Sequence, residues 1–350
     1  MAKLIPRQAV LRMAPYSPPT SGRAGKLRLD FNENTVGSSP AVVEFLKQRL
    51  SEEGLAVYPE YNEARAEIAA FLNVAPEQLV LTNGTDEAIQ LLVNTYVDSG
   101  AGVLLLKPSY AMYRFYAELA GASVVEIPYT GDNLDFPVDE FLGAIGGGVR
   151  AVMIANPNNP TGSAVGLETV EKVLERASGA AVLIDEAYFE FFGVTALGLL
   201  GKHPNLFVSR TFSKVYGMAA LRLGCLISAA ENCAYLRKAQ SPYSVNALAA
   251  LAARAAIRDG EYITRYAAEV REARAMIYAG FERLGIPYVP SQANFVLFRA
   301  GARAIEIRDK LREKNILVRD RSYELPGCVR ITVGTREHAQ RFLDELEKIW

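Results

Sequence analysis

Lys214 stands among small hydroxyl residues and apolar groups, in the segment Arg210-Thr211-Phe212-Ser213-Lys214-Val215-Tyr216-Gly217. A lysine amine that loses its proton easily in such surroundings acts as a nucleophile. Most lysines are simply solvated, so this segment alone leaves both roles open. The chemistry that it suggests is nucleophilic attack by an amine.

A carboxylate and an amide follow two further apolar runs. Asp185 ends the run Ala181 to Asp185, and Asn159 lies in Asn156-Pro157-Asn158-Asn159-Pro160-Thr161-Gly162, directly after the run Arg150 to Ile154. In α/β proteins the carboxyl ends of the strands are where ligands bind. The alternatives are an aspartate that caps the following helix and a common Pro/Asn turn.

Gly84-Thr85-Asp86 begins a helical pattern at the end of another apolar run. A glycine followed by threonine at a helix start lets backbone N–H groups close on an anion, which the helix dipole also attracts. The alternative is a plain helix start with acidic residues in its first turn. This segment is therefore a candidate phosphate site.

The elements that must position these residues alternate along the chain. Short β-rich apolar runs, separated by helix-length segments, predict buried strands of a mostly parallel sheet. The predicted strands are Leu79 to Thr82, Val103 to Leu106, Ser123 to Ile127, Arg150 to Ile154, Ala181 to Asp185, Leu206 to Ser209 and Gly224 to Ser228.

After about residue 245 the pattern changes to a long helical stretch, then to strands and helices that no longer alternate regularly. Ile263, Val270, Ile277 and Leu284 belong to the helical repeat, for which a core-facing helix is favoured over a coiled-coil seam. Strand-like segments follow at Asn294 to Phe298, Ile316 to Val318 and Val329 to Val333, and a terminal helix from about Arg336 to Ile349. We expect a second, smaller α+β domain.

Composition excludes several classes. The 350 residues carry 38 Lys plus Arg against 39 Asp plus Glu, so no strong positive field attracts nucleic acid or acidic lipid. Two histidines and three scattered cysteines predict neither a metal site nor a Ser-His-Asp hydrolase. No apolar run approaches the roughly 20 residues that span a bilayer, and the first residues do not resemble a signal peptide. These features predict a cytoplasmic protein with reduced thiols.

Taken together and in this order, the motifs around Gly84, Asn159, Asp185, Lys214 and Arg222 resemble those of the fold type I aminotransferases that use pyridoxal 5'-phosphate. The resemblance covers essentially the whole chain. It implies a large domain with a mostly parallel seven-stranded sheet sandwiched by helices, and a smaller α+β domain. On this basis we expect an N-terminal arm with part of the small domain at 1–40, the cofactor-binding domain at 41–250 and the C-terminal small domain at 251–350.

The resemblance also implies roles for individual residues. Lys214 matches the Schiff-base lysine and proton shuttle, Asp185 the carboxylate that keeps the ring nitrogen protonated, and Tyr188 a catalytic-site hydroxyl that, with Asn159, hydrogen-bonds the phenolic oxygen. Tyr110 matches the aromatic residue that stacks on the ring. The implied phosphate-binding residues are Gly84, Thr85, Asp86, Thr211, Ser213 and Arg222, with Tyr58 supplied by the neighbouring subunit of a homodimer.

Finer features resemble the histidinol-phosphate aminotransferases. They include Tyr58-Pro59-Glu60, Asn32-Glu33-Asn34, Val318-Arg319-Asp320-Arg321 and Val329-Arg330-Ile331-Thr332-Val333-Gly334. By this resemblance Arg330 and Arg319 hold the anionic end of the substrate, and the implied substrate-binding residues are Tyr16, Asn34, Tyr243, Arg319 and Arg330. Alternation within the last strand places Arg330 and Thr332 on one face.

The implied activity is transamination of L-histidinol phosphate with 2-oxoglutarate, which gives imidazole acetol phosphate and L-glutamate in histidine biosynthesis. The alternatives are an aromatic amino acid aminotransferase and a threonine-phosphate decarboxylase. A regulator that binds the cofactor without turnover is a further class, but the stretch before Tyr16 is too short for a DNA-binding region.

Overall fold

The computed structural model describes residues 4–15 and 21–350, and its largest element is a seven-stranded sheet. The strand order is β2-β8-β7-β6-β5-β3-β4, and only β8 runs against the others. The strands are β2 (Leu79–Thr82), β3 (Gly102–Lys107), β4 (Ser123–Pro128), β5 (Val149–Ala155), β6 (Ala181–Asp185), β7 (Leu206–Thr211) and β8 (Gly224–Ser228). All seven predicted strands are confirmed, three of them with the same bounds and the others within two residues at each end.

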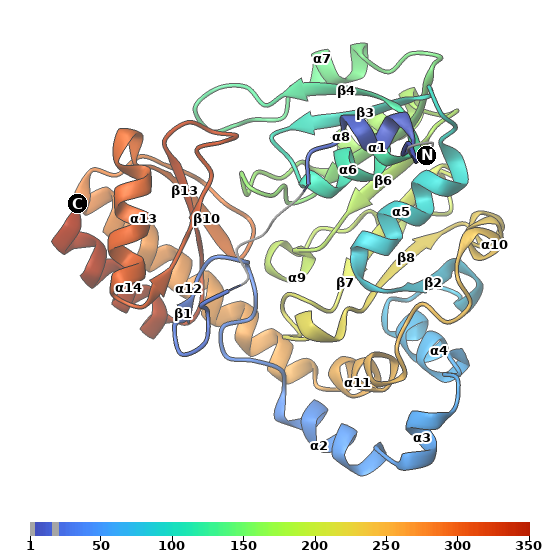
Figure 1. Ribbon diagram of the computed structural model, residues 1–350, viewed down its shortest axis with the longest axis horizontal. Helices are drawn as coiled ribbons and strands as arrows, with labels where there is room; N and C mark the ends of the chain where they lie inside the picture. The colour runs from blue at the N-terminus through green and yellow to red at the C-terminus, as the bar shows by residue number, and fades with distance from the viewer. Residues whose placement is uncertain (1–3, 16–20) are drawn as a thin grey trace.

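Both faces of this sheet are buried, because successive side chains point to opposite sides and both sets are apolar. In β6, Ala181 and Leu183 pack on one face with α5 (Gly84–Tyr96), α6 (Ala111–Ala120) and α10 (Ala230–Ala239). Val182 and Ile184 pack on the other with α4 (Asn62–Phe71), α8 (Leu167–Arg176) and α11 (Ala247–Arg258). Figure 1 shows these helices around the sheet. The expected sandwich of helices is confirmed.

A smaller antiparallel sheet lies beside the first, in the order β12-β13-β10-β9 (Figure 1). Its strands are β12 (Arg319–Asp320), β13 (Cys328–Thr332), β10 (Phe295–Arg299) and β9 (Tyr288–Val289), and its helices are α12 (Gly260–Leu284), α13 (Ala304–Glu313) and α14 (Arg336–Ile349). The smaller α+β part is therefore confirmed. The run from Ile316 does not join this sheet: β11 (Ile316–Leu317) pairs in parallel with β1 (Leu27–Arg28) instead.

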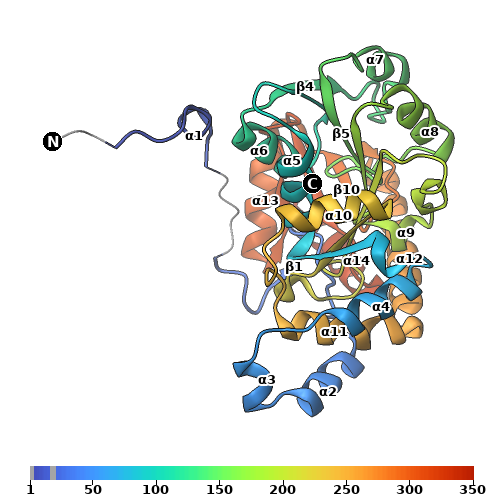
Figure 2. The same cartoon turned by 90° about the vertical axis from the view of Figure 1, so that its right-hand side faces the viewer.

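The N-terminal third adds short helices at the periphery. Figure 2 shows α2 (Pro40–Arg49) and α3 (Glu52–Ala56) at one end of the molecule, next to α11. Helix α1 (Gln8–Arg12) lies outside α6, where Arg7 Nη2 donates to the carbonyl of Leu119 at 3.2 Å. Two further short helices, α7 (Val138–Gly143) and α9 (Phe189–Phe192), come from the middle of the chain. The domain boundaries at 40 and 250 stay a prediction.

Among the described residues, no helix combines the length and the apolar character that a bilayer crossing requires.

Candidate active site

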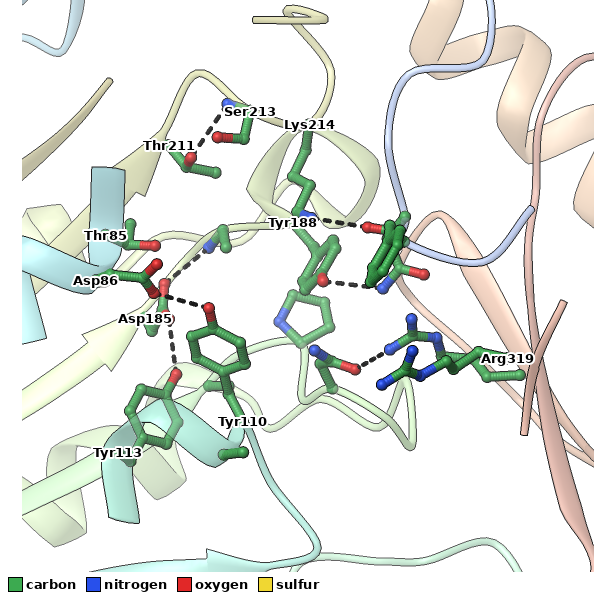
Figure 3. Close-up of a pocket in the computed structure, with 18 of the residues that line it drawn as sticks. Thr85, Asp86, Tyr110, Tyr113, Asp185, Tyr188, Thr211, Ser213, Lys214 and Arg319 are labelled. Atoms are coloured by element: carbon green, nitrogen blue, oxygen red, sulfur yellow. Dashed lines mark hydrogen bonds between the residues drawn. The ribbon is translucent and has the colours of Figure 1, made fainter. Parts of the chain in front are cut away.

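A pocket lies where strands β5, β6 and β7 end and face the smaller sheet (Figure 3). Parallel strands bring their carboxyl ends to one edge, so residues far apart in the sequence meet there. The predicted residues that line it are Thr85, Asp86, Tyr110, Asn159, Asp185, Tyr188, Thr211, Ser213, Lys214, Arg222, Arg319 and Arg330.

Asp185 is the buried carboxylate at the base of this pocket. Its oxygens accept hydrogen bonds from the Tyr113 hydroxyl at 2.6 Å, the Ser209 hydroxyl at 2.8 Å and the Ala187 N–H at 3.2 Å. Ser209 is its register partner on β7, and Tyr113 comes from α6 on the same face of the sheet. Burial raises the pKa of Asp185, and these three donors oppose the rise by stabilising the anion.

Lys214 lies in the loop that follows β7, with its amine in the pocket. Its Nζ donates to the carbonyl of Phe31 at 3.2 Å and lies 5.6 Å from the centre of the Tyr188 ring. The Tyr188 hydroxyl accepts a hydrogen bond from Asn32 Nδ2 at 3.0 Å. Figure 3 shows Lys214, Tyr188 and Asp185 around one space, so an amine, a phenol and a carboxylate line the same pocket.

One end of the pocket is built for an anion by the start of α5. Gly84 has a φ of +72°, and a Cβ there would overlap the Arg222 guanidinium, so only glycine fits. Arg222 Nη2 lies 3.2 Å from Asp86 Oδ2, and its Nη1 lies 3.4 Å from the Ser213 hydroxyl. The Tyr110 hydroxyl donates to Asp86 Oδ1 at 2.7 Å. Hydroxyls, a guanidinium and a helix start thus converge, as phosphate binding requires.

The opposite end is cationic and belongs to the smaller sheet. Arg330 on β13 is 4% exposed, donates through Nη2 to the carbonyl of Asp30 at 2.8 Å, and donates through Nη1 to Asn159 Oδ1. Burial, together with the charges of Arg321 and Arg319, lowers the pKa of Arg330 to about 10. This end therefore favours an anionic group on a ligand.

Four predicted site residues within the described part of the chain are not among those that line this pocket: Gly84, Asn34, Tyr58 and Tyr243. Both amide atoms of Asn34 bond within the chain: Nδ2 donates to the Val215 carbonyl at 2.8 Å, and Oδ1 accepts from the N–H groups of Val36 and Gly37. Tyr58 and Tyr243 stack on each other with ring centres 4.4 Å apart, and Tyr58 is 75% exposed. Tyr16 lies outside the described residues.

The pocket also contains residues that the sequence reasoning did not single out. The polar and aromatic ones among them are Phe31, Asn32, Tyr113, Arg321 and Tyr323. Asn32 adopts a left-handed φ of 57°, which turns it, rather than Asn34, toward Tyr188. Tyr113 lies three residues after the predicted site residue Tyr110, and residues three apart in a helix share a face. This spacing could have predicted that Tyr113 faces the pocket.

Residues 24–346 match the aminotransferase class I and II family. The chain belongs to this family. Its similarity to individual relatives extends over nearly the full length. It is 39% identical to the histidinol-phosphate aminotransferase of Symbiobacterium thermophilum, over 97% of both chains. It is 33% identical to that of a Geobacillus species, over 96% of both chains.

Two solved structures give the same architecture. The histidinol-phosphate aminotransferase of Clostridium acetobutylicum superposes with a TM-score of 0.85 at 27% identity, over 92% of this chain and 98% of that one. That of Sinorhizobium meliloti, solved in complex with pyridoxal-5'-phosphate, superposes with a TM-score of 0.89 at 24% identity, over 100% of this chain and 99% of that one. At that identity the second likeness establishes the fold alone.

The pocket of this aminotransferase fits pyridoxal 5'-phosphate. The cofactor needs an amine for its aldehyde, an anionic partner for its ring nitrogen and a clamp for its phosphate. Lys214 is the amine in the pocket, Asp185 is a buried carboxylate with three donors, and the space beside Gly84 is held open for a guanidinium. All three requirements are met by side chains around one cavity.

Proposed function

We propose that this protein transfers the amino group of L-histidinol phosphate to 2-oxoglutarate, giving imidazole acetol phosphate and L-glutamate. The observation that carries the proposal is the 39% identity to a histidinol-phosphate aminotransferase over 97% of both chains. The reaction belongs to histidine biosynthesis, and pyridoxal 5'-phosphate is its cofactor.

The cofactor supplies an electron-withdrawing ring that accepts the electrons of the substrate Cα–H bond. Lys214 is the proposed catalytic base and acid: its amine takes the Cα proton of the donor and returns a proton at the C4' carbon. Asp185 would pair with the ring nitrogen in its protonated form, because three hydrogen bonds fix the carboxylate in place and stabilise its anion. Tyr188 and Asn159 donate to the phenolic oxygen, and Tyr110 stacks on the ring.

The phosphate of the cofactor is assigned to the end of the pocket at the start of α5. The residues proposed to bind it are Gly84, Thr85, Asp86, Thr211, Ser213 and Arg222. Arg222 supplies the charge, and its ion pair with Asp86 at 3.2 Å fixes its position. The helix start adds N–H donors and a favourable dipole.

The substrate is assigned to the space between the ring and the smaller sheet. Arg319 and Arg330 bind its anionic group, and Tyr110 forms a wall for its imidazole. Tyr16, Asn34 and Tyr243 remain proposed substrate residues. For Asn34 the role is an indirect one, since its amide holds the Val215 carbonyl one residue after Lys214.

We further propose a cytoplasmic homodimer with shared active sites. Tyr58 is 75% exposed, stacks on the 54% exposed Tyr243 and does not reach the pocket of its own subunit. A second copy is the partner that would bury both rings and bring Tyr58 to its phosphate site.

Steady-state transamination with a panel of donors tests the proposal. L-histidinol phosphate, L-phenylalanine and L-threonine phosphate are each supplied with 2-oxoglutarate, and L-glutamate formation is measured. The highest kcat/KM is expected for L-histidinol phosphate. A higher value for phenylalanine would support the aromatic aminotransferase, and carbon dioxide release from threonine phosphate without an oxo acid would support the decarboxylase.

A further inference from the structure

Three arginines lie on one face of the smaller sheet at the substrate end of the pocket. Arg319 on β12 is the direct register partner of Arg330 on β13, so their side chains share a face. The ladder continues past β12, because the Arg321 N–H donates to the Cys328 carbonyl at 2.9 Å. Arg321 is two residues after Arg319 and therefore projects to the same side, where it lines the pocket.

This group of three has fewer negative charges than positive ones. Arg321 pairs with Glu324, whose side chain is only 20% exposed. The acceptors of Arg330 are both neutral: the backbone carbonyl of Asp30 and the side-chain amide oxygen of Asn159. The two acidic residues that line the pocket, Asp86 and Asp185, have partners of their own at the other end. Like charges on facing strands destabilise a sheet, so an excess of buried positive charge needs an anion to offset it.

Two donors at this end are unused. Arg321 and Arg330 are 7% and 4% exposed, and within 4–15 and 21–350 neither Nε has a hydrogen-bond acceptor. Buried guanidinium N–H groups without acceptors are costly, which is typical of a site whose ligand completes them. A phosphate monoester offers three terminal oxygens and up to two charges, whereas a carboxylate offers two oxygens and one charge.

We propose that Arg321 is a specificity residue that makes this site prefer donors with a dianionic phosphate over donors with a carboxylate, with Glu324 as its counter-ion. The inference rests on the proposed function, because it assigns Arg321 to the anionic end of that substrate. Arg319 and Arg330 then supply the binding common to both of the enzyme's substrates, and Arg321 adds the discrimination.

The test compares Arg321→Gln with Glu324→Gln in the cofactor-loaded enzyme, with L-histidinol phosphate and L-glutamate as donors. For Arg321→Gln we expect kcat/KM to fall about 10- to 100-fold with the phosphate donor, as for loss of a charged hydrogen bond, and about threefold with glutamate. Glu324→Gln leaves Arg321 charged and unpaired, so kcat/KM for the phosphate donor is expected to rise about threefold.

A purely structural role of the ion pair predicts a different pattern. Both substitutions would then lower kcat/KM in the same direction and equally for both donors, and that result would overturn the proposal. The pH profile is a second readout: the second pKa of a phosphate ester is about 6, so KM for the phosphate donor should rise from pH 7 to pH 5 in the wild type and rise less in Arg321→Gln.

Failure of the proposed function can be told apart from failure of this inference. If the wild type prefers phenylalanine to L-histidinol phosphate, the proposed function fails. Inhibition of the glutamate reaction by inorganic phosphate then decides the role of Arg321. Weaker inhibition of Arg321→Gln than of the wild type supports a phosphate-binding role, and equal inhibition of both contradicts it.

Discussion

At the scale of single residues, the site depends on how buried polar groups are paired. Asp185 is 4% exposed and burial raises its pKa, but three donors surround its carboxylate and oppose that rise by stabilising the anion. Among the residues that the structure describes, the hydrogen-bond partner of the Lys214 amine is the backbone carbonyl of Phe31, at 3.2 Å. Its amine is therefore not tied to a carboxylate and is available to react.

Lys214→Ala is expected to lower the rate of transamination by about 10²- to 10⁴-fold or more, because the variant lacks the group that transfers the proton. The measurement is single-turnover kinetics with L-histidinol phosphate. Lys310→Ala is the control, since that lysine is exposed and pairs with Glu306 on the surface. Wild-type turnover by Lys214→Ala would refute the assignment.

Tyr113→Phe should shift the acid limb of the pH profile to higher pH. The Tyr113 hydroxyl bonds the anionic form of Asp185 at 2.6 Å, so its loss raises the pKa of Asp185 further. As the pH falls, the carboxylate is then protonated at a higher pH, and its ion pair with the protonated ring nitrogen is lost at that higher pH. The measurement is kcat against pH. Tyr116→Phe removes a hydroxyl from the same helix but leaves the three donors of Asp185 in place, and an identical profile for both variants would count against this role.

At the scale of elements, loop and helix ends hold the site in shape. The start of α5 requires glycine at position 84, and the segment 29–34 is fixed by Arg23, which bonds both Asp30 and Glu33. The same segment carries the carbonyl that accepts from Lys214 and the amide that bonds Tyr188. Both elements can be tested by substitutions whose effects are local.

Gly84→Ala is expected to weaken cofactor binding by at least about tenfold, because the new Cβ displaces the Arg222 guanidinium from the phosphate site. Gly100→Ala is the matched control: its φ is +87°, so the backbone strain is similar, but nothing lies within 4 Å of its Cβ. Both variants should lose about 1 kcal/mol of stability. The measurement is the dissociation constant for the cofactor, and equal losses in both would contradict the account.

Glu33→Gln is expected to cost about 1 kcal/mol of stability at pH 7 and less at pH 3. Burial raises the pKa of Glu33, but the hydrogen bond and charge of Arg23 outweigh it and lower the pKa below the ordinary 4.5. A lowered folded-state pKa means that the contribution is present above about 4.5 and disappears as the pH falls through the folded value.

The measurement is urea unfolding at both pH values. Glu347→Gln, which removes the surface partner of Arg283, is the control and should change nothing measurable. A loss that persists undiminished at pH 3 would refute the pairing with Arg23.

The sequence predicted the elements better than the side-chain placements. The seven strands were found because buried parallel strands are continuous apolar runs between helices. The pairing of β11 with β1 was not, because no local pattern records a partner nearly 290 residues away in the chain. The motif Asn32-Glu33-Asn34 marks the segment and predicts Asn34 as the site residue, whereas the left-handed φ of Asn32, which brings that amide into the pocket, is set by the fold.

At the scale of the whole molecule, the proposed shared site predicts complementation between subunits. Tyr58→Ala and Lys214→Ala are each impaired in their own homodimers. In a mixed dimer one site has both Lys214 and the partner's Tyr58, so random mixing should restore about one quarter of wild-type activity. The measurement is activity after the two variants are unfolded and refolded together. No recovery in confirmed mixed dimers would contradict shared sites.

A half-reaction without any oxo acid tests most directly whether the amino group of L-histidinol phosphate passes to the cofactor. Purified enzyme in its pyridoxal form is mixed with L-histidinol phosphate, and the absorbance of the cofactor and the amount of imidazole acetol phosphate are followed together. We expect conversion of the cofactor to its amino form with about one equivalent of product per subunit, then no further reaction. Absence of conversion, or continued product formation without an oxo acid, would contradict it.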